Sequence, residues 1–154
     1  MAVQQVKNIA YNFNKYCDIE RWASYWHQID EILKINPGSI LEIGVGDKTL
    51  SNYLKNNTTI RYCSLDIAED LQPDIIGDIE NLGVIGDNSY DLICAFEVLE
   101  HLPFEKFEKI LNEFKRISNK WIVISLPHWG RHFSLEIRIP YFKKLHWQFK
   151  VSFP

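Results

Sequence analysis

Cysteine is scarce in this sequence, and both low-complexity tracts and long apolar runs are missing from it. The three cysteines are odd in number and form no CxxC pair, so we expect Cys17, Cys63 and Cys94 to be reduced rather than part of a disulfide framework. No apolar run approaches the length of a membrane span. The N-terminal stretch MAVQQVKNIAYNFNKY is too polar for a secretory signal peptide. These absences predict a cytoplasmic protein without a membrane span.

The composition is that of an ordinary globular chain with an uneven charge. The 154 residues suit one domain, and a hydrophobic content of 46% is enough for a core. We therefore expect residues 1–154 to form a single domain, with about residues 1–16 loosely held. The net charge of −3 argues against nucleic-acid binding by the molecule as a whole. Residues 131–154 depart from this balance, because they carry five lysines and arginines against Glu136 alone.

Short apolar runs alternate with stretches of helical periodicity along most of the chain. The predicted strands are 39–43, 60–65, 74–76, 90–96 and 120–126. The predicted helices are 18–34, a short one around 50–54, and 103–117. This alternation predicts an α/β fold, a doubly wound and mostly parallel sheet with helices on both faces. Buried parallel strands are apolar on both sides, as these runs are.

The helix predicted over 18–34 gathers its largest apolar side chains on one face. The residues that recur there at spacings of three and four are Trp22, Trp26, Ile29 and Leu33. The stretch Asn36-Pro37-Gly38 ends this helix, because proline and glycine both interrupt helical backbone.

The last part of the chain has a different pattern. In residues 133–139 and 145–153, apolar and polar side chains alternate with period two, which predicts a C-terminal antiparallel hairpin with one buried face. Its basic side chains are a candidate surface for RNA or an anionic acceptor, although we favour a simple solvated face. Its aromatic side chains are a candidate cover for an acceptor pocket or a homodimer contact. Because the chain ends at Pro154 without a closing helix, we expect a truncated form of a longer protein.

The first predicted strand runs into a glycine-containing turn, Glu42-Ile43-Gly44-Val45-Gly46-Asp47. A strand, a glycine-rich turn and a helix together let a ligand approach the backbone closely. Thr49 stands where the dinucleotide fingerprint has its third glycine, which argues against a nicotinamide-dependent oxidoreductase.

Acidic residues follow the next two predicted strands. Asp66 ends the second strand twenty positions after Gly46, where a carboxylate can accept hydrogen bonds from both hydroxyls of a ribose. Asp78 ends the third strand. In a doubly wound sheet the carboxyl ends of the strands converge on one crevice. The residues expected to line a single pocket are therefore Glu42, Gly44, Gly46, Asp66, Asp78 and Phe96.

Four stretches of the sequence resemble class I S-adenosylmethionine-dependent methyltransferases of the Rossmann-like fold, particularly small-molecule enzymes of the ubiquinone-biosynthesis type. They are ILEIGVGDKTL (40–50), YCSLDI (62–67), IIGDIENLG (75–83) and YDLICAFEVLEHL (90–102). The resemblance implies S-adenosylmethionine as cofactor and S-adenosylhomocysteine as product. The cofactor-binding residues that it implies are Glu42, Gly44, Gly46, Asp66, Ile67, Asp78, Ile79, Phe96 and Glu97.

The same resemblance implies a role for each part of this set. Glu42 lies near the amino group of the methionine part, which the two glycines let approach, and Asp66 holds the ribose. Asp78 and Ile79 border the adenine. The residues whose backbone lies beside the methionine part are Phe96 and Glu97. Lys48 stands at a position where the family often has a third glycine.

An ExxEH pattern, formed by Glu97, Glu100 and His101, follows the fourth predicted strand. If a helical turn begins there, the three side chains share a face and are candidate ligands for a divalent metal. The pattern resembles that of metal-dependent RNA 2′-O-methyltransferases, in which a metal holds the acceptor hydroxyls. It also occurs in methyltransferases without a metal, where the acids cap the following helix and the histidine packs against the cofactor. We favour this second interpretation.

The candidate general bases are His101 and His128, because imidazole titrates near neutral pH. Trp129, beside His128, is either an acceptor wall or a loop aromatic that closes the core. The sequence thus predicts an S-adenosylmethionine-dependent methyltransferase acting on a small-molecule acceptor that the sequence does not identify. The alternatives are a non-catalytic module that binds the cofactor or a partner, and a metal-assisted RNA 2′-O-methyltransferase.

Overall fold

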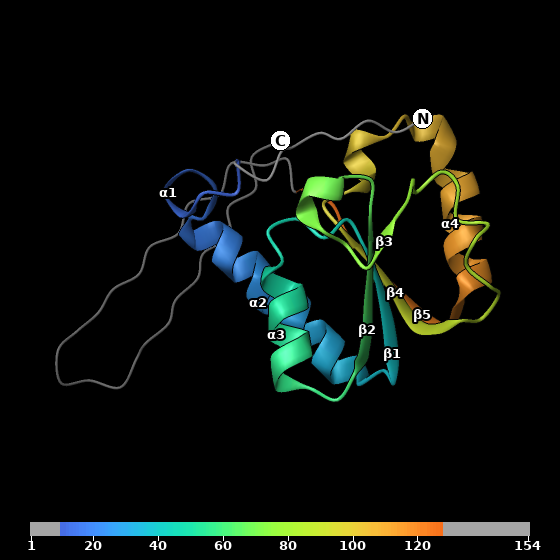
Figure 1. Cartoon of the computed structure of the whole chain (residues 1–154), viewed down its shortest axis with the longest axis horizontal. Helices are drawn as coiled ribbons and strands as arrows, with labels where there is room; N and C mark the ends of the chain where they lie inside the picture. The colour runs from blue at the N-terminus through green and yellow to red at the C-terminus, as the bar shows by residue number, and fades with distance from the viewer. Residues whose placement is uncertain (1–9, 128–154) are drawn as a thin grey trace, which may run out of the picture.

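The structure is a computed structural model of the chain, and it describes residues 10–127 (Figure 1). The strands are β1 (Ser39–Ile43), β2 (Arg61–Asp66), β3 (Ile75–Ile76), β4 (Tyr90–Phe96) and β5 (Ser118–Ser125). The α-helices are α1 (Phe13–Tyr16), α2 (Ile19–Ile35), α3 (Thr49–Asn57) and α4 (Phe107–Ile117). Short 3-10 helices lie between them: η2 (Glu69–Leu71), η3 (Leu99–His101) and η4 (Phe104–Lys106). The predicted C-terminal hairpin lies outside the described residues.

The strands form one sheet in the order β3-β2-β1-β4-β5, and every neighbouring pair is parallel. The predicted parallel sheet is therefore confirmed. The strand order reverses between β1 and β4, since the chain first builds outward to β3 and then returns to the other side of β1. A crevice forms at such a reversal, because the connections leaving the two central strands run to opposite faces of the sheet.

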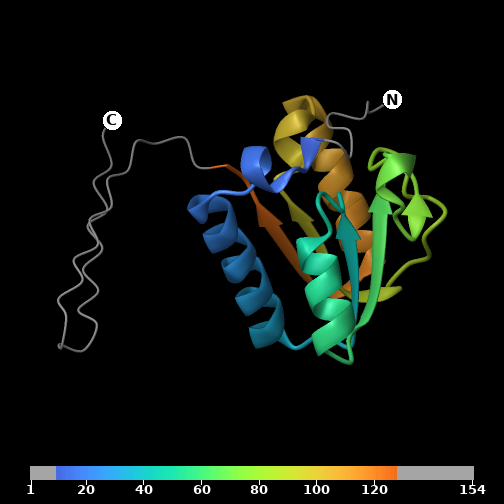
Figure 2. The ribbon, with the colours of Figure 1, turned by 60° about the vertical axis from the view of Figure 1, so that its left-hand side comes forward.

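Helices cover both faces of this sheet (Figure 2). On one face, Ile32 of α2 and Leu54 of α3 pack with Ile40 and Leu92. On the other face, Phe114 of α4 packs with the alternate side chains of the same strands, in a cluster that contains Leu41, Ile43, Ile93 and Ala95. The central strands are buried on both sides, which explains why they appear in the sequence as continuous apolar runs.

Helix α2 occupies the predicted segment, but it buries a different face. Trp26 is 61% exposed and Trp22 is 48% exposed, whereas Tyr25, Gln28 and Ile32 are buried. The two tryptophans of the apolar face are thus largely exposed, and the buried face lies beside them. The buried face carries Tyr25 and Gln28 because it borders a cavity as well as the core, and hydrophobic periodicity gives polar residues no weight.

Cys17, Cys63 and Cys94 are all free, and Cys94 is fully buried in β4. Among the described residues, no helix combines the length and the apolar character that crossing a bilayer requires.

Candidate functional site

A cavity of about 630 Å³ opens at the carboxyl edge of the sheet, at the point where the strand order reverses. Its walls come from the ends of β1, β2 and β4, from the turns that follow them, and from the N-terminal segment that contains α1 and α2. Eight of the nine residues expected to bind the cofactor line this cavity: Glu42, Gly44, Gly46, Asp66, Ile67, Ile79, Phe96 and Glu97.

The turn after β1 is shaped by residues in the left-handed region. Gly44 has φ +82°, and a Cβ built there would lie 2.4 Å from Cγ2 of Val98, which excludes any larger residue without movement. Gly46 has φ +51° and open space around it. Lys48, where the resembling family often has glycine, has φ 65° and caps the start of α3. The turn therefore keeps its left-handed residue at this position despite the lysine side chain.

Asp66 is held between two turns at the end of β2. Its Oδ2 atom accepts a hydrogen bond of 2.8 Å from the backbone N–H of Val45, and its Oδ1 atom accepts one of 2.8 Å from Ala68. Each carboxylate oxygen has more than one lone pair, so both oxygens can accept a further bond from a ligand in the cavity. This carboxylate ties the turn after β1 to the end of β2 and faces the cavity.

Glu42 is a buried carboxyl group on the cavity wall. Only 4% of the residue is exposed, and its Oε2 atom accepts a hydrogen bond from the phenol of Tyr62. Burial raises the pKa of Glu42 to about 8, although the hydrogen bond from Tyr62 favours the charged form. A cation entering the cavity would therefore meet a buried carboxyl group that has almost no contact with water.

Asp78 differs from the other predicted residues. Its Oδ1 atom accepts a hydrogen bond of 2.9 Å from the backbone N–H of Glu80, and it is not part of the cavity lining. The turn that Asp78 stabilises places its neighbours Ile79 and Glu80 on the wall. Asp78 therefore affects the cavity indirectly, by stabilising the turn that carries Ile79 and Glu80.

The turn after β4 does not continue as a regular helix. Glu97 has φ 54°, and its carboxylate forms an ion pair with Arg21 and lies 3.4 Å from Oγ of Ser24. Glu100 and His101 follow in η3, and 4.0 Å separates Nε2 of His101 from Oε1 of Glu100. Within residues 10–127, no group of three or more histidines, cysteines and acids is close enough together to hold a metal ion. The helical face assumed for Glu97, Glu100 and His101 is absent, because left-handed backbone at Glu97 turns its side chain toward α2.

Of the two predicted general bases, the structure describes only His101. His101 lines the cavity with about half of its side chain exposed. His128 and Trp129 lie outside the described residues.

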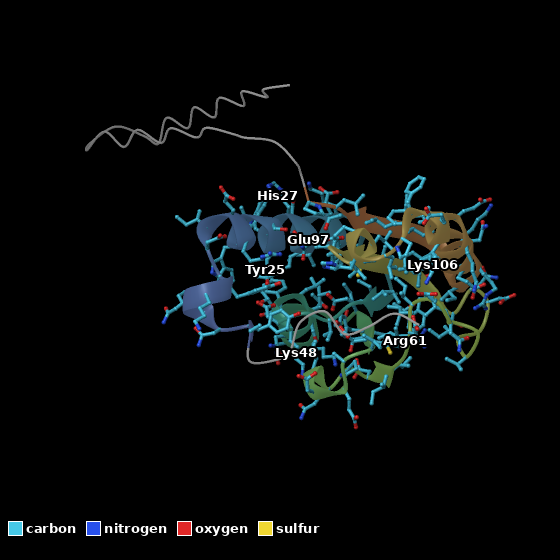
Figure 3. The ribbon with its side chains drawn as sticks, turned by 90° about the horizontal axis from the view of Figure 1, so that it is seen from above. Tyr25, His27, Lys48, Arg61, Glu97 and Lys106 are labelled. Carbon is cyan, nitrogen blue, oxygen red and sulfur yellow. The ribbon has the colours of Figure 1, made fainter. Side chains whose placement is uncertain are left out.

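An N-terminal group that the sequence analysis missed forms the remaining wall. Three tyrosines line the cavity and are called here the tyrosine cluster: Tyr11, Tyr16 and Tyr25. The rings of Tyr11 and Tyr16 meet edge to face at 4.7 Å, and the Tyr25 hydroxyl donates a 2.7 Å hydrogen bond to Oδ2 of Asp47. Figure 3 labels Tyr25 on α2 together with Glu97 and Lys48, which belong to the turns after β4 and β1.

The tyrosine cluster carries a cation on one side. The guanidinium of Arg21 lies over the ring of Tyr16, 4.8 Å from its centroid, while it pairs with Glu97. Burial raises the pKa of Tyr11 to about 12, with smaller contributions from Tyr16, Asp66 and Asp47. The N-terminal segment had no sequence signal for these contacts, because its tyrosines follow no helical or strand period.

Comparison with known proteins agrees with this architecture. A family model described as a methyltransferase domain matches residues 41–120, more than half of the chain. No curated protein matches the sequence.

Solved structures share the fold at low sequence identity. A protein from Methanococcus maripaludis classed as an S-adenosyl-L-methionine-dependent methyltransferase superposes with a TM-score of 0.61 at 18% identity, over 82% of this chain and 68% of its own. A SAM-dependent methyltransferase from Archaeoglobus fulgidus gives 0.54 at 19% identity, over 73% and 60%.

A phosphoethanolamine N-methyltransferase from Haemonchus contortus, solved with phosphomonomethylethanolamine and S-adenosylhomocysteine, gives 0.52 at 15% identity, over 84% of this chain and 37% of its own. The chain thus spans little more than a third of the length of that neighbour and less than two thirds of the Archaeoglobus fulgidus protein. With the family model matched across β1 to β5 and the fold shared with these structures, the chain belongs to the methyltransferase-domain family and has the fold of S-adenosylmethionine-dependent methyltransferases.

Proposed function

We propose that this S-adenosylmethionine-dependent methyltransferase domain binds its cofactor in the cavity at the carboxyl edge of the sheet and transfers the methyl group to a small-molecule acceptor. The observation that carries the proposal is the meeting of Glu42, Asp66 and the Gly44–Gly46 turn, which is open at Gly46, around one cavity. These groups suit the cofactor chemically, because they offer a buried carboxyl group, a carboxylate with free lone pairs and accessible backbone.

Each residue has a role that follows from its place on the wall. Glu42 receives the ammonium group of the methionine part, and Asp66 accepts hydrogen bonds from the ribose hydroxyls. The absence of a side chain at Gly46 leaves room for the methionine part, while Gly44 lets Val98 pack against the same turn. Two apolar side chains that line the cavity flank the adenine: Ile67 and Ile79.

The remaining residues set the edges of the cofactor site. Asp78 acts through the turn that places Ile79 on the wall. Backbone at Phe96 and Glu97 borders the methionine part, and the ion pair between Glu97 and Arg21 holds α2 beside it.

Bound S-adenosylmethionine would supply an electrophilic methyl group, which an acceptor O, N or C atom attacks in line to leave S-adenosylhomocysteine. The chain contributes mainly by holding the acceptor against that methyl group, since positioning alone lowers such a barrier substantially. His101 takes a proton from the acceptor, either directly or through water, because its imidazole lines the cavity and stays partly exposed. His128 is the second candidate for this role.

We propose a reaction that does not depend on a divalent metal, since Glu97 is engaged by Arg21 and does not share a face with Glu100 and His101. We also propose a reduced, cytoplasmic setting, which suits the free thiols.

Calorimetric titration of S-adenosylmethionine and S-adenosylhomocysteine into the full chain tests the cofactor site. We expect Asp66→Ala to weaken binding by about tenfold or more, the worth of one charged hydrogen bond. Asp87→Ala is the matched control, because Asp87 is an exposed aspartate whose ion pair with Arg116 lies away from the cavity. If the folded wild-type chain binds neither molecule, the proposed function is wrong.

A further inference from the structure

Among the described residues that line the cavity, the lysine and the arginine are in ion pairs, whereas the carboxylate of Asp47 is not. The two cationic side chains of the cavity in the described part of the chain are already paired, Arg21 with Glu97 and Lys106 with Glu80 at 2.6 Å. Asp47 also lines the cavity, yet among residues 10–127 its hydrogen-bond partners are a phenol, a backbone N–H and a thiol rather than a lysine or arginine. An anionic acceptor would therefore find no unpaired lysine or arginine on the described walls, whereas a cation would find a carboxylate that is hydrogen-bonded but not paired with a lysine or arginine.

Asp47 lies within the tyrosine cluster. The Tyr25 hydroxyl donates to Oδ2 of Asp47, and the backbone N–H of Thr49 donates to Oδ1 at 3.0 Å, so the carboxylate is fixed in place. The pKa values of Tyr11 and Tyr16 are raised first by burial and also by the charge of Asp47, which means that both phenols lie within its field. The cluster therefore combines aromatic rings with the ion pair of Arg21 and Glu97 and with the additional negative charge of Asp47.

The arrangement proposed above assigns no cofactor group to Asp47 or to the tyrosine cluster, although Asp47 directly follows the Gly44–Gly46 turn that borders the methionine part. Glu42 and Asp66 are assigned to the ammonium group and the ribose, and both belong to the sheet edge. The tyrosine cluster comes instead from residues 11–25, and Tyr11 packs against Val45, Ala68 and Leu71 at the cavity rim. The cluster and Asp47 therefore lie beside the turn assigned to the methionine part, where a second substrate must meet the methyl group.

We infer that the methyl acceptor is an amine, held through its cationic nitrogen by Asp47 and the tyrosine cluster. This inference rests on the proposed function. Aromatic faces attract ammonium groups electrostatically, and tyrosine cages with a nearby carboxylate favour them most when water is excluded. The guanidinium of Arg21 over the ring of Tyr16 is a cation–π contact of this kind within the same cluster.

The chemistry balances for an amine. The bound ammonium first loses a proton to His101 or to water, which frees the nitrogen lone pair. The nitrogen then forms a bond to the methyl carbon while the carbon–sulfur bond breaks and its electron pair stays on sulfur. The product is an N-methylated ammonium ion, which carries the same charge as the substrate ammonium and so retains affinity for Asp47.

The test compares probes that differ in charge but hardly in shape. Choline, its uncharged carbon isostere neohexyl alcohol and the anion tert-butylacetate are each titrated into the full chain saturated with S-adenosylhomocysteine. We expect choline to bind at least about tenfold more tightly than neohexyl alcohol, and tert-butylacetate to bind most weakly. Equal affinities for choline and neohexyl alcohol, or binding of neither, would overturn the inference.

Two variants locate the preference. Asp47→Asn is expected to abolish the advantage of choline, and titration of S-adenosylhomocysteine into the same variant shows whether the cavity is intact. Asp87→Asn, the same substitution on an exposed aspartate outside the cavity, is expected to keep the advantage in full. A preference for choline that survives Asp47→Asn would contradict the assignment.

A turnover assay completes the test. The chain is supplied with S-adenosylmethionine and dimethylaminoethanol, and release of S-adenosylhomocysteine is measured beside a reaction with neohexyl alcohol. We expect release only with the amine. The two proposals fail differently: a chain that does not bind S-adenosylhomocysteine overturns the proposed function and this inference with it, whereas a chain that binds it without preferring the cationic probe overturns the amine acceptor alone.

Discussion

The Tyr62 phenol donates a hydrogen bond to the Glu42 carboxyl group across the pair of strands β1 and β2. Both side chains lie on the same face of the sheet, since Tyr62 pairs with Ile40, two residues before Glu42. Burial raises the pKa of Glu42 to about 8 from an ordinary value of 4.5. The residue proposed to receive the cofactor ammonium is therefore also a group whose ionisation costs folding free energy.

The stability of the empty chain should depend on pH through Glu42. Its folded pKa lies above its unfolded pKa, so between pH 4.5 and about 8 the folded state binds more protons and stability falls as pH rises. Above about pH 8 the cost is complete. We expect Glu42→Gln to be more stable than the wild type there by roughly 1–3 kcal/mol, with little difference near pH 4.5.

Urea unfolding of both proteins at several pH values measures this effect. Parallel pH profiles for the wild type and Glu42→Gln would show that Glu42 does not titrate in this range. Glu113→Gln, at a partly exposed position of α4, serves as the control, because neighbouring Arg116 lowers the pKa of Glu113 instead.

The left-handed backbone at Lys48 predicts a stabilising substitution. A residue with a Cβ at φ 65° costs on the order of 1 kcal/mol relative to glycine. We expect Lys48→Gly to raise the free energy of unfolding by about that amount in thermal or urea denaturation. Lys109→Gly, an exposed lysine inside α4, is the matched control and should lower it by about 0.5–1 kcal/mol. Destabilisation by both substitutions would argue against the left-handed turn.

The two glycines of the turn after β1 should respond differently to alanine. Gly44→Ala adds a Cβ that collides with Val98 and also strains the backbone, so we expect a loss of about 2–4 kcal/mol. Gly46→Ala meets open space and should lose only about 1 kcal/mol, while its methyl group enters the cavity and weakens cofactor binding.

A double-mutant cycle separates the collision at Gly44 from the strain. Val98→Ala removes the methyl group that the new Cβ would strike, so the pair Gly44→Ala and Val98→Ala should recover about 1 kcal/mol relative to additivity. Strict additivity would show that no collision occurs.

Arg116 should contribute more to stability than its place near the end of α4 suggests. Its guanidinium donates to the backbone oxygens of Leu82 and Ile85 and to Asp87, which fixes the loop before β4. We expect Arg116→Met to lower the free energy of unfolding clearly more than a neighbouring exposed substitution does, because carbonyl groups of that loop lose their donor. Lys115→Met, on the exposed side of the same turn, should change stability by less than about 0.5 kcal/mol. Similar values for the two variants in urea unfolding would contradict this role.

The sequence predicted the parts of the fold that burial determines. β1 and β4 have the predicted bounds, because a strand buried on both faces needs a continuous apolar run. The start of β5 was placed two residues late, since α4 passes directly into the strand without a turn signal at Ser118. The buried face of α2 does not follow from its apolar residues, because Trp22 and Trp26 are largely exposed while Tyr25 and Gln28 border the cavity.

The candidate site was predictable to the extent that strand ends define it. Glu42, Asp66 and Phe96 share a cavity because parallel strands end at one edge, and their order in the chain is enough to place them there. The tyrosine cluster was not predictable, since its position depends on how α1 and α2 fold back over that edge. The left-handed backbone at Glu97 was likewise not predictable, since it accompanies a long-range ion pair with Arg21.

The walls of the cavity come from two separate stretches of sequence. Residues 42–106 supply the sheet edge, and residues 11–28 supply the wall that we assign to the acceptor. If that assignment holds, a change of acceptor can be made by exchanging a short segment ahead of the first strand while the scaffold is inherited unchanged. Selection would then act on the two stretches at different rates, and grafting the N-terminal segment of one such domain onto the sheet of another becomes a route to new specificity.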